Sequence, residues 1–174
     1  MLGVRSILTG AASLSLAAAL PTPTEGLALA FPGARSVRKE HILGEAQLQR
    51  VRSLAQVEPG SGWVVAYEAW AGDQFLGVAF FDTHRVRTLP ETVLVAVEAG
   101  GHLRRVEVVS FREPLEYLPK AAWVRQLEGR GLDEELSLKR GIRPLSGATL
   151  SAHALVDAAR RSLALFRILY AERP

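Results

Sequence analysis

The sequence predicts an α+β fold: an antiparallel sheet of two hairpins, with an N-terminal helix, a short middle helix and a long C-terminal helix. Two observations indicate the hairpins, namely short runs rich in β-branched and aromatic residues and the glycine-containing turns between them. A third observation indicates the helices, because apolar residues recur every three or four positions before and after these runs. This grouping of strands and helices favours helices packed on one face of the sheet.

The first helix is predicted over residues 37–56. Its apolar positions fit one helical face: Ile42, Leu43, Ala46, Val51, Leu54 and Ala55. Glu58-Pro59-Gly60 follows them, and proline with glycine is a typical end of a helix.

The two hairpins are expected in the middle of the chain. The first joins residues 63–70 and 75–81 through Ala71-Gly72-Asp73. The second joins residues 93–97 and 106–111 through Gly100-Gly101. A polar loop over residues 82–90 is expected between them.

Two further helices are predicted after the strands. The middle helix covers residues 119–128 and is ended by Gly129 and Gly131. The last helix covers residues 151–170, and its apolar stripe is Leu155, Ala159, Ser162, Phe166 and Leu169.

Residues 1–30 have the layout of a secretory signal. Arg5 gives a basic start, residues 7–20 are apolar, and Ala28-Leu29-Ala30 fits a cleavage site. The prediction is therefore an exported, periplasmic protein whose mature domain is residues 31–174 and is soluble after cleavage. An uncleaved N-terminal anchor is the alternative, although the apolar run is shorter than the roughly 20 residues of a membrane-spanning helix.

Composition excludes several classes of protein. The chain of 174 residues contains no cysteine, which rules out disulfides, thiolate metal sites and iron–sulfur clusters. Its net charge is +3, and its arginines are scattered rather than gathered into the basic stripe of a nucleic-acid-binding protein. We therefore expect no nucleic-acid partner.

The candidate site is the stretch Ser146-Gly147-Ala148-Thr149, followed by Ser151, immediately before the last helix. Small residues let a bulky ligand approach the backbone, and the free N–H groups at a helix N-terminus favour a phosphate. The alternative is that Thr149 or Ser151 is simply a helix N-cap.

This stretch resembles the Ser-Gly-Ala-Thr motif of the FMN-binding domain family, which includes subunits of ion-pumping and periplasmic electron-transfer complexes. The resemblance extends over residues 80–171 and includes Glu113-Pro114 and the aromatic middle segment. It implies that FMN is attached to Thr149 through a phosphoester and that Tyr117 or Trp123 contacts the isoalloxazine ring. Trp123 as a core residue is the alternative.

The sequence departs from the family pattern in two places. Arg143 stands where many flavinylated members have an aspartate, three residues before the motif serine. Glu113-Pro114-Leu115-Glu116 stands where the electron-transfer subunits carry a Gly-rich Glu-Thr-Pro-Gly segment. Arg143 is suited to grip a phosphate in bidentate fashion, so non-covalent FMN is a second possibility.

The resemblance implies an electron-transfer flavoprotein rather than a stand-alone FMN-dependent reductase, since no acid–base pair points to a substrate reaction. The implied partners are a flavin transferase and a redox protein: a membrane reductase, a quinone-linked complex or a cytochrome. An exported accessory module without flavin is the alternative from another functional class.

Other groupings of polar residues are weaker. Asp82 and His84 could bind a metal with one of Asp133, Glu134 and Glu135, but no spacing supports it, and we expect no metal site. Ser146, His153 and Asp157 lack the strand-turn-helix context of a hydrolase triad, so no catalytic residues are predicted.

Overall fold

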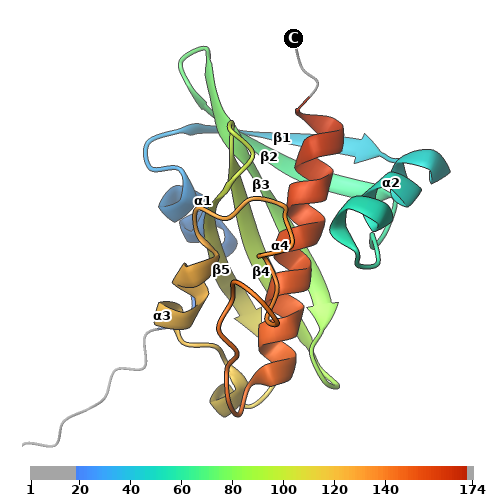
Figure 1. The fold of residues 1–174 in the computed structure, drawn as a ribbon. Coiled ribbons are helices and arrows are strands. Elements are labelled where there is room, and N and C mark those ends of the chain that lie inside the picture. Colours follow the sequence, from blue (N-terminus) through green and yellow to red (C-terminus); the bar gives the residue numbers. More distant parts are fainter. Residues whose placement is uncertain (1–18, 172–174) are drawn as a thin grey trace, which may run out of the picture.

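The computed structural model describes residues 19–171 and confirms the α+β class. Its elements in chain order are α1 (Pro23–Ala30), β1 (Arg35–Ile42), α2 (Glu45–Ala55), β2 (Trp63–Ala71), β3 (Gln74–Arg85), β4 (Pro90–Glu98), β5 (Leu103–Phe111), η1 (Leu115–Tyr117), α3 (Ala121–Val124), η2 (Arg125–Leu127) and α4 (Thr149–Leu169). The strands form one antiparallel meander in the order β1-β2-β3-β4-β5 (Figure 1).

The predicted hairpins are present as β2–β3 and β4–β5, and a further strand, β1, lies beside β2. Residues 37–42 belong to this strand, so the predicted helix over residues 37–56 is wrong in its first third. All of β1 pairs with β2, from Arg35 opposite Trp70 to Ile42 opposite Trp63. Ile42 is 88% exposed on this strand, and α2 begins only at Glu45, with Gly44 as its N-cap. The apolar pattern was therefore produced by two elements in succession.

Helices cover both faces of the sheet rather than one. The larger core lies between one face and the helices α2 and α4, whose buried residues include Val51, Ala55 and Leu155. On the other face, α1 packs against β4 and β5. A smaller core cluster lies there, formed by Ala30, Phe31, Ala69, Ala79, Leu94 and Ala96. The predicted packing on one face is corrected accordingly.

The helix α4 is the longest in the described chain and runs along the sheet (Figure 1). Its predicted apolar stripe is confirmed, since Leu155, Ala159, Ser162 and Phe166 are buried and Leu169 packs against the core. The helix begins at Thr149, two residues before the predicted start. Arg160 on α4 donates from Nε to the carbonyl oxygen of Ala55 at 2.6 Å, which fixes α2 beside it.

The middle segment differs from the prediction in length. The expected helix over residues 119–128 consists of the short α3 and η2 in succession. Strand β3 continues to Arg85 and β4 begins at Pro90, so the loop predicted over residues 82–90 shrinks to four residues, 86–89. The consequence is that Asp82 and His84 lie on a strand of the sheet.

The residues of the predicted signal are only partly described. Arg5 and most of the apolar run lie outside the described residues, while residues 23–30 form α1. Gly26 lies against Leu94 and Val109, and Arg104 donates from Nε to the Ala30 carbonyl oxygen at 2.6 Å. Cleavage after Ala30 would therefore separate a packed helix from the sheet. No helix within residues 19–171 has the length and apolar character needed to cross a membrane.

We expect a chain that begins at Phe31 to be less stable than one that begins at Leu20. Without α1, the buried side chain of Leu94 and the alanines beside it are exposed, and the expected loss is about 3 kcal/mol. Urea unfolding followed by tryptophan fluorescence measures the difference. Equal unfolding midpoints for the two chains would show that α1 contributes nothing to the fold.

Candidate flavin-anchoring site

The loop before α4 leaves Thr149, the candidate site of attachment, exposed to solvent. Gly147 has a φ of +82°, a conformation that residues with a Cβ rarely adopt. This turn places Ala148 at the N-cap position of α4 and Thr149 at its first helical position. Thr149 is exposed, and its Oγ1 donates to the Leu145 carbonyl oxygen at 3.3 Å. The hydroxyl is thus accessible to solvent at the start of the helix.

The N-terminus of α4 has no side-chain cap, because its N-cap residue is an alanine. Among the described residues, the backbone N–H groups of Thr149, Leu150 and Ser151 donate to no acceptor. The alternative that Thr149 or Ser151 caps the helix is therefore wrong. A 21-residue helix instead presents unsatisfied donors and the positive end of its dipole beside the Thr149 hydroxyl.

The three hydroxyls of the motif are not equally accessible. Ser146 and Thr149 are exposed, whereas Ser151 is 1% exposed. The Oγ of Ser151 is buried and has no hydrogen-bond partner. Within residues 19–171, the only other buried side-chain oxygen without a partner is Oε1 of Glu91. Ser151 consequently faces the protein interior rather than the surface on which Thr149 lies.

The predicted residues Trp123 and Arg143 are brought together. Trp123 donates from Nε1 to the carbonyl oxygen of Arg143 at 2.8 Å, and the Arg143 N–H donates to Oε1 of Gln126 at 2.8 Å. These two bonds attach the loop before α4 to the segment α3–η2. Trp123 also packs partly against the core, as its alternative interpretation proposed. The exposed Arg143 guanidinium makes no ion pair or hydrogen bond within the described chain, and it is available for an anion.

Tyr117, the other predicted ring contact, has a different neighbour. The guanidinium of Arg87 lies over its ring, 4.1 Å from the centroid. One face of the ring is therefore covered by a cation from the loop between β3 and β4. A flavin could stack only on the opposite face of Tyr117.

Glu113, of the Glu-Pro element, organises that same loop. Its buried Oε1 accepts the backbone N–H groups of Arg87, Thr88 and Leu89 at 3.1, 2.7 and 2.8 Å. The bonds from Leu89 and Thr88 contribute most to holding the pKa of the Glu113 carboxyl below its ordinary value. The carboxylate thus shapes a surface loop without reaching the surface itself.

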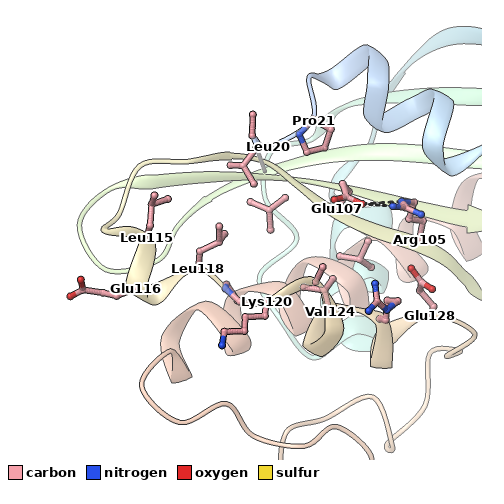
Figure 2. A pocket seen from close by; sticks show the side chains of 16 residues that line it. Leu20, Pro21, Arg105, Glu107, Leu115, Glu116, Leu118, Lys120, Val124 and Glu128 are labelled. Carbon is pink, nitrogen blue, oxygen red and sulfur yellow. Dashed lines mark hydrogen bonds and ion pairs between the residues drawn. The ribbon is translucent and has the colours of Figure 1, made fainter. Parts of the chain in front are cut away.

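A cavity of about 540 Å³ lies on the other side of the middle segment (Figure 2). Apolar side chains such as Leu20, Leu118 and Val124 line it, and charged residues including Lys120 and Glu128 stand around it. Neither Trp123 nor any residue from Arg143 to Ser151 lines this cavity. The Thr149 hydroxyl is therefore not in the wall of this cavity.

The weaker metal hypothesis is not supported, because the residues it named are separated. His84 bonds to Asp82 Oδ1 through Nδ1 at 2.9 Å and to Glu91 Oε2 through Nε2 at 3.0 Å. Asp133 instead accepts backbone N–H groups of its own turn. Within residues 19–171, no cluster of three acidic or histidine side chains has a metal-binding arrangement.

The histidine belongs to an ionic cluster that sequence reasoning missed. Arg161 on α4 binds Asp82 Oδ2 through Nε at 3.0 Å, and Glu91 is fully buried. Since both ring nitrogens of His84 face carboxylate oxygens, both must donate, which makes the ring an imidazolium. Burial alone would lower the pKa of His84, but the hydrogen bonds and charges of Asp82 and Glu91 outweigh it and raise the pKa to about 9.

The hydrolase alternative also finds no support. Ser146 and His153 are exposed, and no hydrogen bond within the described chain joins either of them to Asp157. Burial raises the pKa of the Asp157 carboxyl, against the opposing charge of Arg161 one turn further along α4. Asp157 is thus associated with the ionic cluster rather than with Ser146.

Comparison with known proteins adds no relative: the chain matches no protein-family model, no curated protein and no solved structure.

The His84 cluster predicts a pH-dependent stability. The pKa of His84 lies above its ordinary 6.5, so its stabilising effect is complete below about pH 6.5 and is lost as the pH rises through 9. Urea unfolding between these pH values should show falling stability in the parent protein and a flatter profile in His84→Gln. His102→Gln, at an exposed position, is the matched control and should keep the parent slope. A parent-like slope in His84→Gln would contradict the assignment.

Proposed function

We propose that the protein is an exported, periplasmic flavoprotein that carries one FMN on Thr149 and passes electrons between redox partners. The observation that carries this proposal is the uncapped start of α4. Thr149 is exposed there, the backbone N–H groups of Thr149 and the exposed Leu150 have no acceptor, and an ester phosphate on Thr149 Oγ1 would accept from them. If the Thr149 side chain capped the helix, it would itself accept from one of these N–H groups, and fewer donors would be left for an anion.

Attachment would require a separate flavin transferase, because a threonine hydroxyl is a weak nucleophile and the group that accepts the Thr149 hydroxyl proton is the Leu145 carbonyl oxygen, which is not a base. The flavin donor would be a flavin dinucleotide. The bond from Thr149 Oγ1 to the FMN phosphorus forms, the diphosphate bond of the dinucleotide breaks, and the nucleoside monophosphate leaves with the hydroxyl proton. Ser146 and Gly147 leave this side of the loop open for such an enzyme.

The bound FMN would supply the redox chemistry, while residues of this chain hold and orient it. The exposed guanidinium of Arg143 would bind phosphate oxygens. Trp123 fixes the loop through the Arg143 carbonyl oxygen, and the loop in turn sets the position of Thr149. The proposed partners that deliver and collect the electrons are a membrane reductase, a quinone-linked complex or a cytochrome.

Covalent attachment is tested by producing the exported protein together with a flavin transferase. We expect yellow colour to remain with the acid-precipitated protein, and the peptide containing Thr149 to gain the mass of FMN less one water. Thr149→Ser should keep the adduct and Thr149→Val should lose it, since valine preserves the shape but removes the hydroxyl. Ser53→Ala, at an exposed position on α2, is the control and should remain yellow. A colourless parent protein would favour the accessory module without flavin. An FMN adduct on a peptide that lacks Thr149 would show that another residue is the acceptor.

The free Arg143 guanidinium supports a second form of the proposal, in which FMN is held without a covalent bond. In the Thr149→Val background, FMN should bind more tightly than riboflavin, which lacks the phosphate. Arg143→Gln should remove this difference, which we expect to be about tenfold or more for a charged hydrogen bond. Fluorescence quenching titrations measure both affinities, with the exposed Arg125→Gln as control. Equal affinities for the two flavins in the Thr149→Val protein would contradict a phosphate-binding role of Arg143.

A further inference from the structure

The ordered loop between β3 and β4 exposes a set of arginine and leucine side chains. Because Glu113 holds the backbone N–H groups of residues 87–89 from inside, the side chains of this loop are directed to the outside. We define the arginine face as Arg85, Arg87, Leu89, Arg112 and Leu115, all of which are exposed. The buried carboxylate therefore holds this surface loop in one form.

Backbone contacts show that the members of the arginine face lie together. Arg85 pairs with Pro90 across the β3–β4 turn, and the Arg112 N–H donates to the Pro90 carbonyl oxygen at 3.2 Å. Arg87 stacks on Tyr117, which ends the 3-10 helix that begins at Leu115. The β3–β4 turn and residues 112–117 are thus joined by two contacts, Arg112 with Pro90 and Arg87 with Tyr117.

The arginine face is positively charged, and its guanidinium groups are not neutralised by carboxylates, although Arg85 donates from Nη1 to the carbonyl oxygen of Thr88 at 3.1 Å. No ion pair in the described chain involves Arg85, Arg87 or Arg112. In residues 83–90 and 110–117, Glu116 is the one exposed carboxylate, since Glu113 is buried. Arg87 is also preorganised, because the Tyr117 ring holds its planar guanidinium while the N–H edges stay available for a bidentate carboxylate.

Two exposed leucines complete the surface. Leu89 and Leu115 are 42% and 68% exposed, and they belong to a small set of large apolar side chains that the described surface leaves open. Arginine and aromatic residues beside apolar contacts are typical of protein interfaces. Three arginines are too few for the basic stripe of a nucleic-acid site, and two leucines give little apolar area for insertion into a lipid surface.

We propose that the arginine face is the docking surface for an acidic protein partner, whose carboxylates bind Arg87 and its neighbours. This inference rests on the proposed function, in which electrons pass to another protein. Figure 1 shows the β3–β4 turn and the first turn of α4 at the same end of the molecule, so a partner docked there would approach the proposed flavin end. Its positive charge would steer an acidic partner to this end and speed association.

Binding is tested on the full mature chain with a short peptide of alternating glutamate and leucine as probe. Amide NMR signals of residues 85–89 and 112–117 should shift on titration. Arg87→Glu and Arg112→Glu should each weaken binding roughly tenfold. Arg35→Glu, which makes the same change in net charge on β1, should leave the affinity unchanged. Arg112 does not stack on Tyr117, so its variant remains informative if Arg87→Glu disturbs the fold.

Equal weakening by Arg35→Glu would overturn the proposal, because binding would then reflect net charge alone. Tighter binding of a DNA duplex or of anionic lipid vesicles to the same residues would overturn it too. The peptide titration does not need the cofactor, so a colourless protein that passes it would contradict the proposed function and leave the docking surface standing. In yellow protein, ferricyanide should oxidise the reduced flavin more slowly in Arg112→Glu than in Arg35→Glu, while cationic hexaammineruthenium should show the reverse.

Discussion

The packing of α4 against the sheet is the interaction on which the rest of the structure depends. Eleven of its residues are buried, and each large apolar side chain so placed contributes about 1.5–3 kcal/mol. An N-cap, by comparison, is worth about 1 kcal/mol. A helix held so firmly by its apolar face can leave its first turn without a cap. The free N–H groups beside Thr149 therefore lower the stability of the protein only slightly, and they remain available to a ligand.

Two buried carboxylates give the same end of the sheet its rigidity, and they do so in different ways. Glu91 is neutralised by the His84 imidazolium, which Asp82 and Arg161 connect to α4. Glu113 has no cationic hydrogen-bond partner and is satisfied by backbone N–H groups instead. The first arrangement joins strands to a helix, and the second shapes a loop.

The sequence predicts well what depends on neighbouring residues. The hairpins and the stripe of α4 follow from periods of two and of three to four, and both are confirmed. Residues 37–42 were misassigned because their apolar spacing continues into α2, and only pairing with β2 shows that they form an edge strand. The site divides in the same way. The motif before α4 is contiguous and visible, whereas the pairs Arg87–Tyr117 and Asp82–Arg161 join residues far apart in the chain, and no local pattern reports them.

The exposure of Thr149 also bears on how a flavin could work here. A non-covalent cofactor needs an enclosing pocket for its affinity, but the 540 Å³ cavity is lined by none of the residues from Arg143 to Ser151. A phosphoester removes that need, because the attached ring cannot dissociate even where the protein encloses little of it. An open site favours direct contact between the ring edge and a protein partner over reaction with a small substrate, which would require a closed pocket to exclude water. Under the proposed function, the openness that argues against a reductase is thus what an electron carrier requires.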